Sequence, residues 1–233
     1  MTSTLLLAFA VIALVAQSAS PAFERRTFKM PDGSTVRYGL AVPGDYRASA
    51  PRPLVIALHP GGGGTPYYGD QFMRTIFVPG LQELGAITIA PDVPTRAWTD
   101  PQAEQAVLSL ISAVRDEFAI DRRRVVVVGF SLGGSGAWFL SARHSDLFSA
   151  AIVMAGRTDE PPANLAKIPT YVIHSLNDQV VPFAQAEQRV AALRQLGRRV
   201  QFDTLTGVGH HEMGGYLPAL RNGGRWVREQ WER

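Results

Sequence analysis

The stretch Val125-Val126-Val127-Val128-Gly129-Phe130-Ser131-Leu132-Gly133-Gly134 decides the fold of this chain. Its four valines are β-branched and apolar, which indicates a strand buried on both faces, as in a parallel sheet. Gly-Phe-Ser-Leu-Gly follows directly and fits the pattern Gly-x-Ser-x-Gly, and residues 134–143 then carry a helical pattern. A strand, this pentapeptide and a helix in succession predict a sharp turn that presents the Ser131 hydroxyl above the sheet. An ordinary glycine-rich turn is the alternative, but the buried strand favours Ser131 as a nucleophile.

The segments on both sides of this turn alternate between strand and helix patterns. A turn signal at residues 31–34 predicts a β-hairpin, and the alternation from residue 54 onward implies right-handed crossovers. The fold class is therefore α/β, with a mostly parallel sheet and helices on both faces. The expected strands are 24–30, 35–42, 54–58, 86–90, 125–128, 150–154, 170–174 and 200–205, and the expected helices are 69–84, 101–118, 134–143, 183–196 and 215–231, the last of which Gly223-Gly224 could interrupt.

Size and composition indicate one globular domain. The chain has 233 residues, enough for a single α/β domain with a sizeable core. Hydrophobic residues make up 46% and charged residues 18%, a balance that excludes disordered and fibrous classes. The net charge is +3, and the arginine clusters at 122–124 and 198–199 have no interleaved aromatic residues, so no nucleic-acid partner is expected. Cysteine is absent, which excludes disulfides, thiolate catalysis and zinc–cysteine sites.

Residues 1–20 carry the pattern of a secretory signal peptide. Leu5 to Ala16 is an apolar run too short for a membrane-spanning helix, and small residues follow at 16–20. No Lys or Arg precedes the apolar run, so an uncleaved anchor is the alternative. We expect secretion to the periplasm or out of the cell, followed by a domain over residues 21–233 without a membrane span.

A serine hydroxyl needs a base to accept its proton, and a third group to orient that base. Of the 5 histidines, His210 and His211 follow the last strand, where the order serine, acid, histidine requires the base. We favour His210, because it directly follows Gly207-Val208-Gly209, a segment that can fold back over the sheet. His211 is the alternative base or a neighbour that packs nearby. A metal site is not expected here, because only Glu212 accompanies the two imidazoles.

The acid is expected at another strand end between the serine and the histidine. Asp178 lies in the segment that follows strand 170–174, and the carboxyl ends of parallel strands meet at one edge of a sheet. A carboxylate there can accept the imidazole Nδ1–H and stabilise the imidazolium that forms. Asp159 and Glu160, in the linker after the preceding strand, are the alternatives.

Attack on a carbonyl creates an oxyanion, which two preorganised backbone N–H groups normally stabilise. The residue after the nucleophile, Leu132, supplies the first N–H. The second is expected from the four glycines after strand 54–58, with Gly61 as first choice and Gly62 as second, because glycine exposes its backbone N–H. A phosphate-binding loop is the competing interpretation, but Gly-Lys-Ser/Thr and Gly-x-Gly-x-x-Gly are both missing, so no nucleotide is expected.

The chain resembles the α/β-hydrolase superfamily. The motifs that carry the resemblance are Gly-Phe-Ser-Leu-Gly, His-Pro-Gly-Gly-Gly, Asn-Asp-x-Val-Val-Pro and Gly-Val-Gly-His, in the family's usual order. Within the superfamily, the segments beginning at Val55 and His174 are most similar to phospholipase/carboxylesterase and polyhydroxybutyrate-depolymerase-like esterases. One departure is Pro60, which stands where the family usually has glycine and has no N–H to donate.

The residues and the resemblance together predict a serine hydrolase of carboxylic esters that needs no metal or organic cofactor and acts on a small-molecule ester. The linker between strands 150–154 and 170–174 is short where capped relatives carry their insertion, so we expect no large cap domain. Tyr67, Tyr68 and Trp98 could stack on an aromatic or sugar ester at the rim, or pack under loops. Arg157 could contact an anionic substrate. A thioesterase or peptidase of the same fold is the alternative, and a non-catalytic binding protein is the further one.

Overall fold

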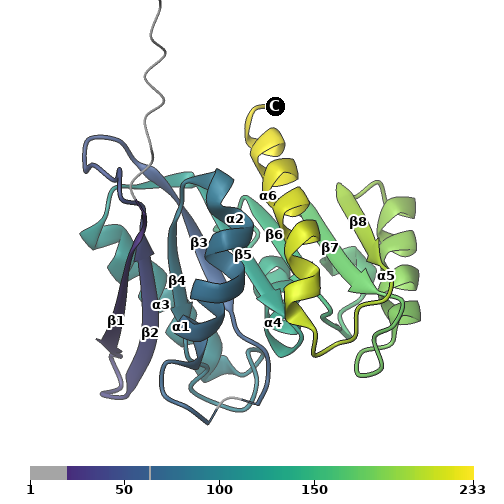
Figure 1. Ribbon diagram of the computed structural model, residues 1–233, viewed down its shortest axis with the longest axis horizontal. Coiled ribbons are helices and arrows are strands. Elements are labelled where there is room, and N and C mark those ends of the chain that lie inside the picture. The colour runs from purple at the N-terminus through teal and green to yellow at the C-terminus, as the bar shows by residue number, and fades with distance from the viewer. Residues whose placement is uncertain (1–19, 63) are drawn as a thin grey trace, which may run out of the picture.

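Eight strands form one sheet, in the order β1-β2-β4-β3-β5-β6-β7-β8 (Figure 1). The computed structural model describes residues 20–62 and 64–233. β1 pairs antiparallel with β2 and β2 antiparallel with β4, whereas the other neighbours are all parallel. The strands are β1 (Ala22–Lys29), β2 (Thr35–Val42), β3 (Arg52–Leu58), β4 (Ile87–Pro91), β5 (Ile120–Phe130), β6 (Ala150–Met154), β7 (Thr170–Ser175) and β8 (Val200–Leu205).

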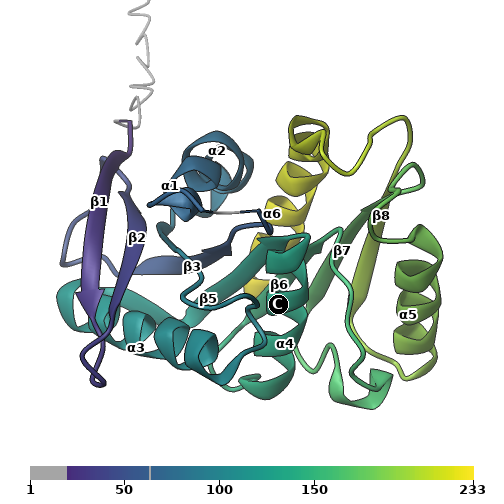
Figure 2. The same ribbon diagram turned by 90° about the horizontal axis from the view of Figure 1, so that it is seen from below.

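Helices cover both faces of the sheet, as Figure 2 shows. One face packs against α3, α4 and α5, and the other against α1, α2 and α6. Each face has its own apolar cluster, so the central strands are buried on both sides. The helices are α1 (Tyr68–Phe72), α2 (Val78–Leu81), α3 (Pro101–Glu117), α4 (Leu132–Arg143), α5 (Phe183–Gln195) and α6 (Leu217–Trp231), with short turns η1 (Met73–Phe77), η2 (Gln82–Leu84), η3 (Pro162–Asn164) and η4 (Met213–Tyr216).

This architecture confirms the predicted α/β class with a mostly parallel sheet. β6 and β8 have the predicted bounds, and β5 begins at Ile120, five residues before the valine run. Between β6 and β7, residues 155–169 contain only the single turn η3, and the structure has no large cap there. Between β6 and β7, the carboxyl ends of these strands are therefore not covered by an inserted domain.

The predicted helix over 69–84 is observed as an uninterrupted helical span over 68–84, which changes type along its length. α1 passes into a π-helical turn, η1, before α2 and the 3-10 turn η2. Pro79 is the second residue of α2. Because a proline has no N–H and its ring clashes with the carbonyl four residues before it, a regular α-helix would place this clash on Thr75 within η1. The wider π-helical turn relieves that collision, so the segment is helical as predicted but is not one regular α-helix.

Gly223 and Gly224 do not interrupt the last helix. α6 runs without a break from Leu217 to Trp231, and both glycines are buried. A Cβ on Gly224 would lie 3.2 Å from a methyl carbon of Leu81, and one on Gly223 would lie 3.1 Å from the ring of Tyr171. These glycines therefore allow α6 to approach both α2 and the sheet closely.

The N-terminal hairpin is fastened to α1 by a buried carboxylate. Asp70 has no exposed surface, and its two oxygens each accept a 2.8 Å hydrogen bond, one from Nε of Arg25 on β1 and one from Nε of Arg74. The two guanidiniums also lie over aromatic rings, Arg25 over Tyr67 and Arg74 over Phe23. This cluster joins the edge of the sheet to the helix that covers it.

The predicted signal segment lies almost entirely outside the described residues, because residues 1–19 are not described. Within residues 20–62 and 64–233, none of the helices combines the length and the apolar character that crossing a membrane would require.

Candidate active site

Ser131 lies in a strained turn between β5 and α4. Its φ of 55° is in the left-handed region that residues with a Cβ avoid, and its N–H donates to the carbonyl of Met154 over 2.9 Å. The turn closes only because Gly129 and Gly133 have no side chains. A Cβ on Gly129 would collide with the carbonyl oxygen of Gly133, and a Cβ on Gly133 with that of Leu58. The turn therefore places the Ser131 hydroxyl at the carboxyl edge of the sheet.

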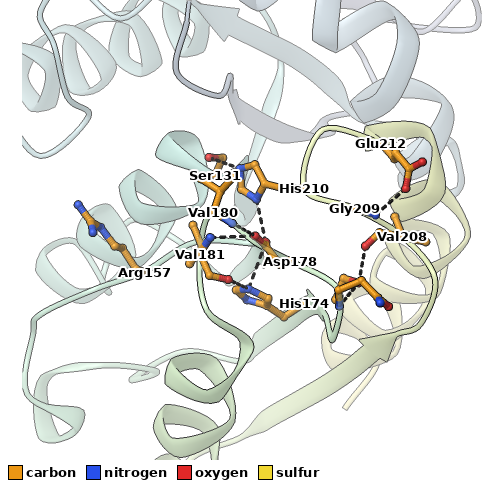
Figure 3. A network of polar contacts seen from close by, with 12 residues as sticks. Ser131, Arg157, His174, Asp178, Val180, Val181, Val208, Gly209, His210 and Glu212 are labelled. Atoms are coloured by element: carbon orange, nitrogen blue, oxygen red, sulfur yellow. Dashed lines mark hydrogen bonds and ion pairs between the residues drawn. The ribbon is translucent and has the colours of Figure 1, made fainter.

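His210 joins Ser131 to Asp178. Its Nε2 lies 2.8 Å from the Ser131 Oγ, and its Nδ1 lies 2.8 Å from Oδ2 of Asp178 (Figure 3). An ionised carboxylate only accepts hydrogen bonds, so Nδ1 carries the proton and Nε2 is free to accept the serine O–H. The ring is buried at 6% exposure and packs against Phe130, with the ring centres 5.2 Å apart. The structure thus brings together three side chains that lie far apart in the chain.

Asp178 is an ionised carboxylate in a buried position. Burial opposes ionisation, but the hydrogen bond from His210 and the backbone N–H groups of Val181 and Val180, at 2.8 and 2.9 Å, outweigh it. The pKa of Asp178 therefore lies below its usual value. Asp159 and Glu160, the alternative acids, line a different hollow, and among the described residues neither forms a hydrogen bond or ion pair with His210 or Ser131.

Side-chain hydrogen bonds fasten the loop of Asp178 to the loop of His210. The Ser175 hydroxyl donates to the carbonyl of Val208 over 2.5 Å, and the Gly207 N–H donates to Oδ1 of Asn177 over 2.6 Å. Within the second loop, the Gly209 N–H donates to Oε2 of Glu212. These bonds fix His210 relative to Asp178 before any substrate arrives.

His211 does not share this arrangement. Its side chain is exposed, and its ring meets that of His210 edge to face with centres 5.3 Å apart. No hydrogen bond joins His211 to Ser131 or Asp178 within the described residues. The geometry therefore distinguishes the two adjacent histidines.

The glycine loop after β3 lies beside the Ser131 turn. A Cβ on Gly61 would come within 3.8 Å of the Leu132 Cβ, so the two predicted oxyanion donors are neighbours. Gly62 adopts a φ of +94°, which glycine accepts at little cost. The base of the loop is held by His59, whose Nε2 accepts the Val93 N–H and whose Nδ1 therefore donates to the carbonyl of Pro60.

A cavity of about 840 Å³ opens in front of Ser131. Aromatic and other apolar side chains form much of its wall, and the glycine loop and the His210 loop form its two sides. Its size is within the usual range for small-molecule sites. The lining residues include Gly61, Gly62, Tyr68, Phe72, Phe130, Val180, His210, His211 and Met213.

The predicted rim residues divide between two hollows. Tyr68 lines the Ser131 cavity, whereas Tyr67 and Arg157 do not. Arg157 lines a second hollow of about 570 Å³, together with Leu132 and Trp98, and Figure 3 shows Arg157 to one side of Ser131 with its guanidinium directed away. Phe72, Phe130 and Met213 line the Ser131 cavity and were not predicted; the position of Phe130, directly before the serine, was the available signal.

Trp98 takes the second of the two positions that the sequence left open: it packs beneath the loops, at the base of the second hollow. Its side chain is 1% exposed, and its Nε1–H donates to the carbonyl of His59 over 3.0 Å. A Cβ on Gly136 would collide with the Trp98 side chain. The indole therefore packs directly against the α4 backbone at Gly136. Trp98 therefore supports the glycine loop from below.

Among the described residues, no group of three or more histidine, aspartate or glutamate side chains could hold a metal ion.

A mostly parallel sheet, a strained strand-to-helix serine and a histidine after the last strand define an α/β-hydrolase. A model of the phospholipase/carboxylesterase family matches residues 94–222, more than half of the chain. The chain therefore belongs to that family, as the sequence resemblance predicted.

Known relatives are esterases by name. "Probable feruloyl esterase C" of Aspergillus niger is 27% identical over 157 residues, which cover 63% of this chain and 56% of the relative. Feruloyl esterase D of Neurospora crassa is 24% identical over 175 residues, covering 67% and 58%. The chain thus spans a little over half the length of these relatives.

Solved structures share the fold. The crystal structure of a thermostable esterase has a TM-score of 0.77 and 28% identity, and the match covers 89% of this chain and 62% of that one. A ferulic acid esterase has a TM-score of 0.75 with 17% identity, covering 91% and 98%, and supports the fold alone.

Proposed function

We propose that this chain is a serine esterase in which Ser131, His210 and Asp178 form the catalytic triad. The observation that carries the proposal is the pair of 2.8 Å hydrogen bonds on the two nitrogens of one imidazole. A histidine arranged in this way can accept the serine proton on Nε2 while the carboxylate fixes its tautomer and stabilises its positive charge. Membership of the carboxylesterase family favours an ester as the bond that is cleaved.

The reaction then proceeds in two halves. Oγ of Ser131 forms a bond to the acyl carbon as its proton passes to Nε2 of His210, which leaves negative charge on the carbonyl oxygen. The carbon–oxygen bond to the alcohol breaks, and His210 returns the proton to that oxygen. A water molecule, deprotonated by His210, attacks the acyl-enzyme, and the free acid leaves as Ser131 recovers its proton.

The backbone N–H groups of Leu132 and Gly61 stabilise the oxyanion in this proposal. Leu132 is the first residue of α4, whose N-terminus carries partial positive charge, and Gly61 lies next to it. Gly62 is the alternative second donor. The Pro60 carbonyl is engaged by His59, which orients the loop from its base.

The cavity favours an ester with an aromatic or extended apolar acyl group. Tyr68, Phe72 and Phe130 supply aromatic walls close to Ser131. The names of the feruloyl esterase relatives point in the same direction. The open edge of the sheet, without a large cap, suits soluble substrates that approach directly.

We also propose that the protein acts outside the cytoplasm. The support is the apolar run from Leu5 to Ala16, followed by small residues. Expression of the whole chain and N-terminal sequencing of the exported material test this. A start near residues 19–22 supports the proposal, and exported material that retains Met1 would favour the uncleaved anchor.

The nucleophile is tested by fluorophosphonate labelling followed by peptide mapping. Ser131, Ser135 and Ser141 fall on one tryptic peptide, residues 125–143, so fragment ions must assign the adduct. We expect the adduct on Ser131 and a loss of kcat of about 10⁴-fold or more in Ser131→Ala. Ser135→Ala, one helical turn further along, is the matched control and should retain activity. Labelling at another serine, or an active Ser131→Ala, would overturn the proposal.

The bond that is cleaved is tested separately with matched substrates. An aryl ester, the corresponding thioester and the corresponding amide should show kcat/KM highest for the ester if the assignment is right. A clear preference for the thioester or the amide would retain the triad and replace the esterase with a thioesterase or peptidase.

A further inference from the structure

A second imidazole lies against Asp178. His174 is at the end of β7, and its side chain has no exposed surface. Its Nε2 is 2.8 Å from the carbonyl oxygen of Val181 and 3.3 Å from Oδ2 of Asp178, the same oxygen that accepts the His210 hydrogen bond. Figure 3 shows His174 and His210 on opposite sides of this carboxylate.

The surroundings fix the tautomer of His174. Both neighbours of Nε2 are acceptors, so Nε2 carries the proton and donates it to Val181. Nδ1 is buried without a hydrogen-bond partner, and adding a proton there would create an N–H with no acceptor. Burial lowers the pKa of His174, although Val181 and Asp178 act in the opposite direction. The ring is therefore a neutral donor.

His174 reaches the carboxylate by two routes. Its hydrogen bond to the Val181 carbonyl holds the residue whose N–H donates to Oδ1 of Asp178. The Nε2–H of His174 also faces Oδ2 of Asp178. The negative charge on that oxygen is therefore stabilised by both His174 and His210. Both oxygens of the acid thus depend on the position of this one ring.

The other titratable groups around the cluster do not compete for this role. Tyr216, from η4, is buried with its hydroxyl unbonded, and burial and the charge of Asp178 raise its pKa, so it stays neutral. From α5, the ring of Phe183 packs against His174 with centres 6.1 Å apart. No lysine or arginine among the described residues pairs with Asp178; the side chains that contact its oxygens there are the imidazoles of His174 and His210.

We propose that His174 is a positioning residue for the acid: it sets the place and charge of the Asp178 carboxylate and so tunes His210 as a base. The inference rests on the proposed triad. Without the His174 N–H, the charge on Oδ2 is shared less, and the carboxylate stabilises the His210 imidazolium more strongly. In the absence of that N–H, His210 stays protonated, and so unable to accept the serine proton, up to a higher pH.

The test compares His174→Leu, which removes the donor, with His174→Gln, whose amide N–H can reach the place of Nε2. We expect His174→Leu to lower kcat about 10- to 100-fold on a soluble aryl ester with KM within about twofold, because a small displacement of catalytic groups costs this much. The acidic limb of its kcat/KM profile should move to higher pH by about half a unit. His174→Gln should recover most of kcat and the position of that limb.

A folded His174→Leu enzyme with the wild-type kcat and acidic limb would overturn the proposal, as would equal losses in both variants. If His174→Leu does not fold, nitrogen NMR of the ¹⁵N-histidine-labelled wild type decides. A neutral Nε2–H tautomer of His174 through the active pH range supports the proposal, and an imidazolium or an Nδ1–H tautomer overturns it. That readout does not depend on turnover, so it separates this inference from failure of the proposed esterase activity.

Discussion

Asp70 and Asp178 both have fully buried carboxylates, yet their partners belong to different chemical classes. Asp70 is paired with two guanidiniums, which remain charged whenever the protein is folded. Asp178 is bonded to backbone N–H groups and to imidazole, which can gain a proton near neutral pH. The first arrangement can only hold two elements together, whereas the second responds when a proton arrives on His210. Burial of a charge therefore does not mark a catalytic site; the ability of its partner to change charge does.

The largest expected effect on kcat follows from removing His210, the partner of Asp178 that can change its charge. We expect His210→Ala to lower kcat by about 10⁶-fold, because neither the serine proton nor the alcohol oxygen then has a proton carrier. His211→Ala is the matched control, and its kcat should stay within about threefold of wild type. Steady-state hydrolysis of an aryl ester measures both. A larger loss in His211→Ala would exchange the roles of the two residues.

Asp178→Asn tests the responsive carboxylate itself. We expect kcat to fall about 10⁴-fold, because an amide leaves the imidazole in the wrong tautomer and removes the charge opposite the imidazolium. The thermal unfolding midpoint should change little, since the Asn carbonyl oxygen can still accept the N–H groups of Val180 and Val181. A loss of less than about tenfold would indicate that Asp159 or Glu160 supplies the acid.

Asp70→Asn should have the opposite pattern. We expect about 3 kcal/mol loss in the free energy of unfolding, because two guanidiniums lose a buried partner. The loss is at the low end of the usual range because the Arg25 and Arg74 side chains are 58% and 38% exposed and can be hydrated. Urea titration measures the stability, and kcat of the folded variant should equal that of wild type. A fall in kcat without loss of stability would contradict this prediction, because it would mean that Asp70 contributes to catalysis and not to folding.

The smallest effect is a gradual loss of stability in mild acid. Burial lowers the pKa of both His59 and His174, so the unfolded chain binds more protons below its histidine pKa of about 6.5. The stability that their neutral forms contribute is fully present above that pH and is lost as the pH falls toward the lower pKa of the folded state. Unfolding midpoints at pH 8, 6.5 and 5 should fall in that order. A midpoint that is flat over this range would contradict the neutral assignment.

Sequence reasoning predicted what local patterns determine. The valine run, the Gly-x-Ser-x-Gly turn and the alternation of elements led to the α/β fold, because burial on both faces leaves a continuous apolar strand. Strand order then gathered Ser131, Asp178 and His210 at one edge, and the structure brings these three together. The order of the motifs was sufficient to place these residues together, because the carboxyl ends of parallel strands lie at the same edge of the sheet.

Features that depend on tertiary packing could not be predicted in this way. The π-helical turn before Pro79 arises where α1 and α2 must cover the sheet, and a periodic pattern does not record it. Trp98 lies in a loop without periodicity, so the indole could face solvent or core until α4 was placed against it. His174 was visible as a histidine at a strand end, but its contact with Asp178 depends on how the following loop turns back.

The position of β8 has a consequence for the time at which the protein becomes active. β8 is one of the two edge strands and follows the other strands of the sheet in chain order, and His210 comes after it. A nascent chain that has emerged only as far as the Ser131 turn does not yet contain His210, the proposed acceptor of the serine proton. With the proposed triad, hydrolysis can begin only when β8 joins β7 and brings His210 to Ser131, so incomplete or unfolded chains should have no esterase activity.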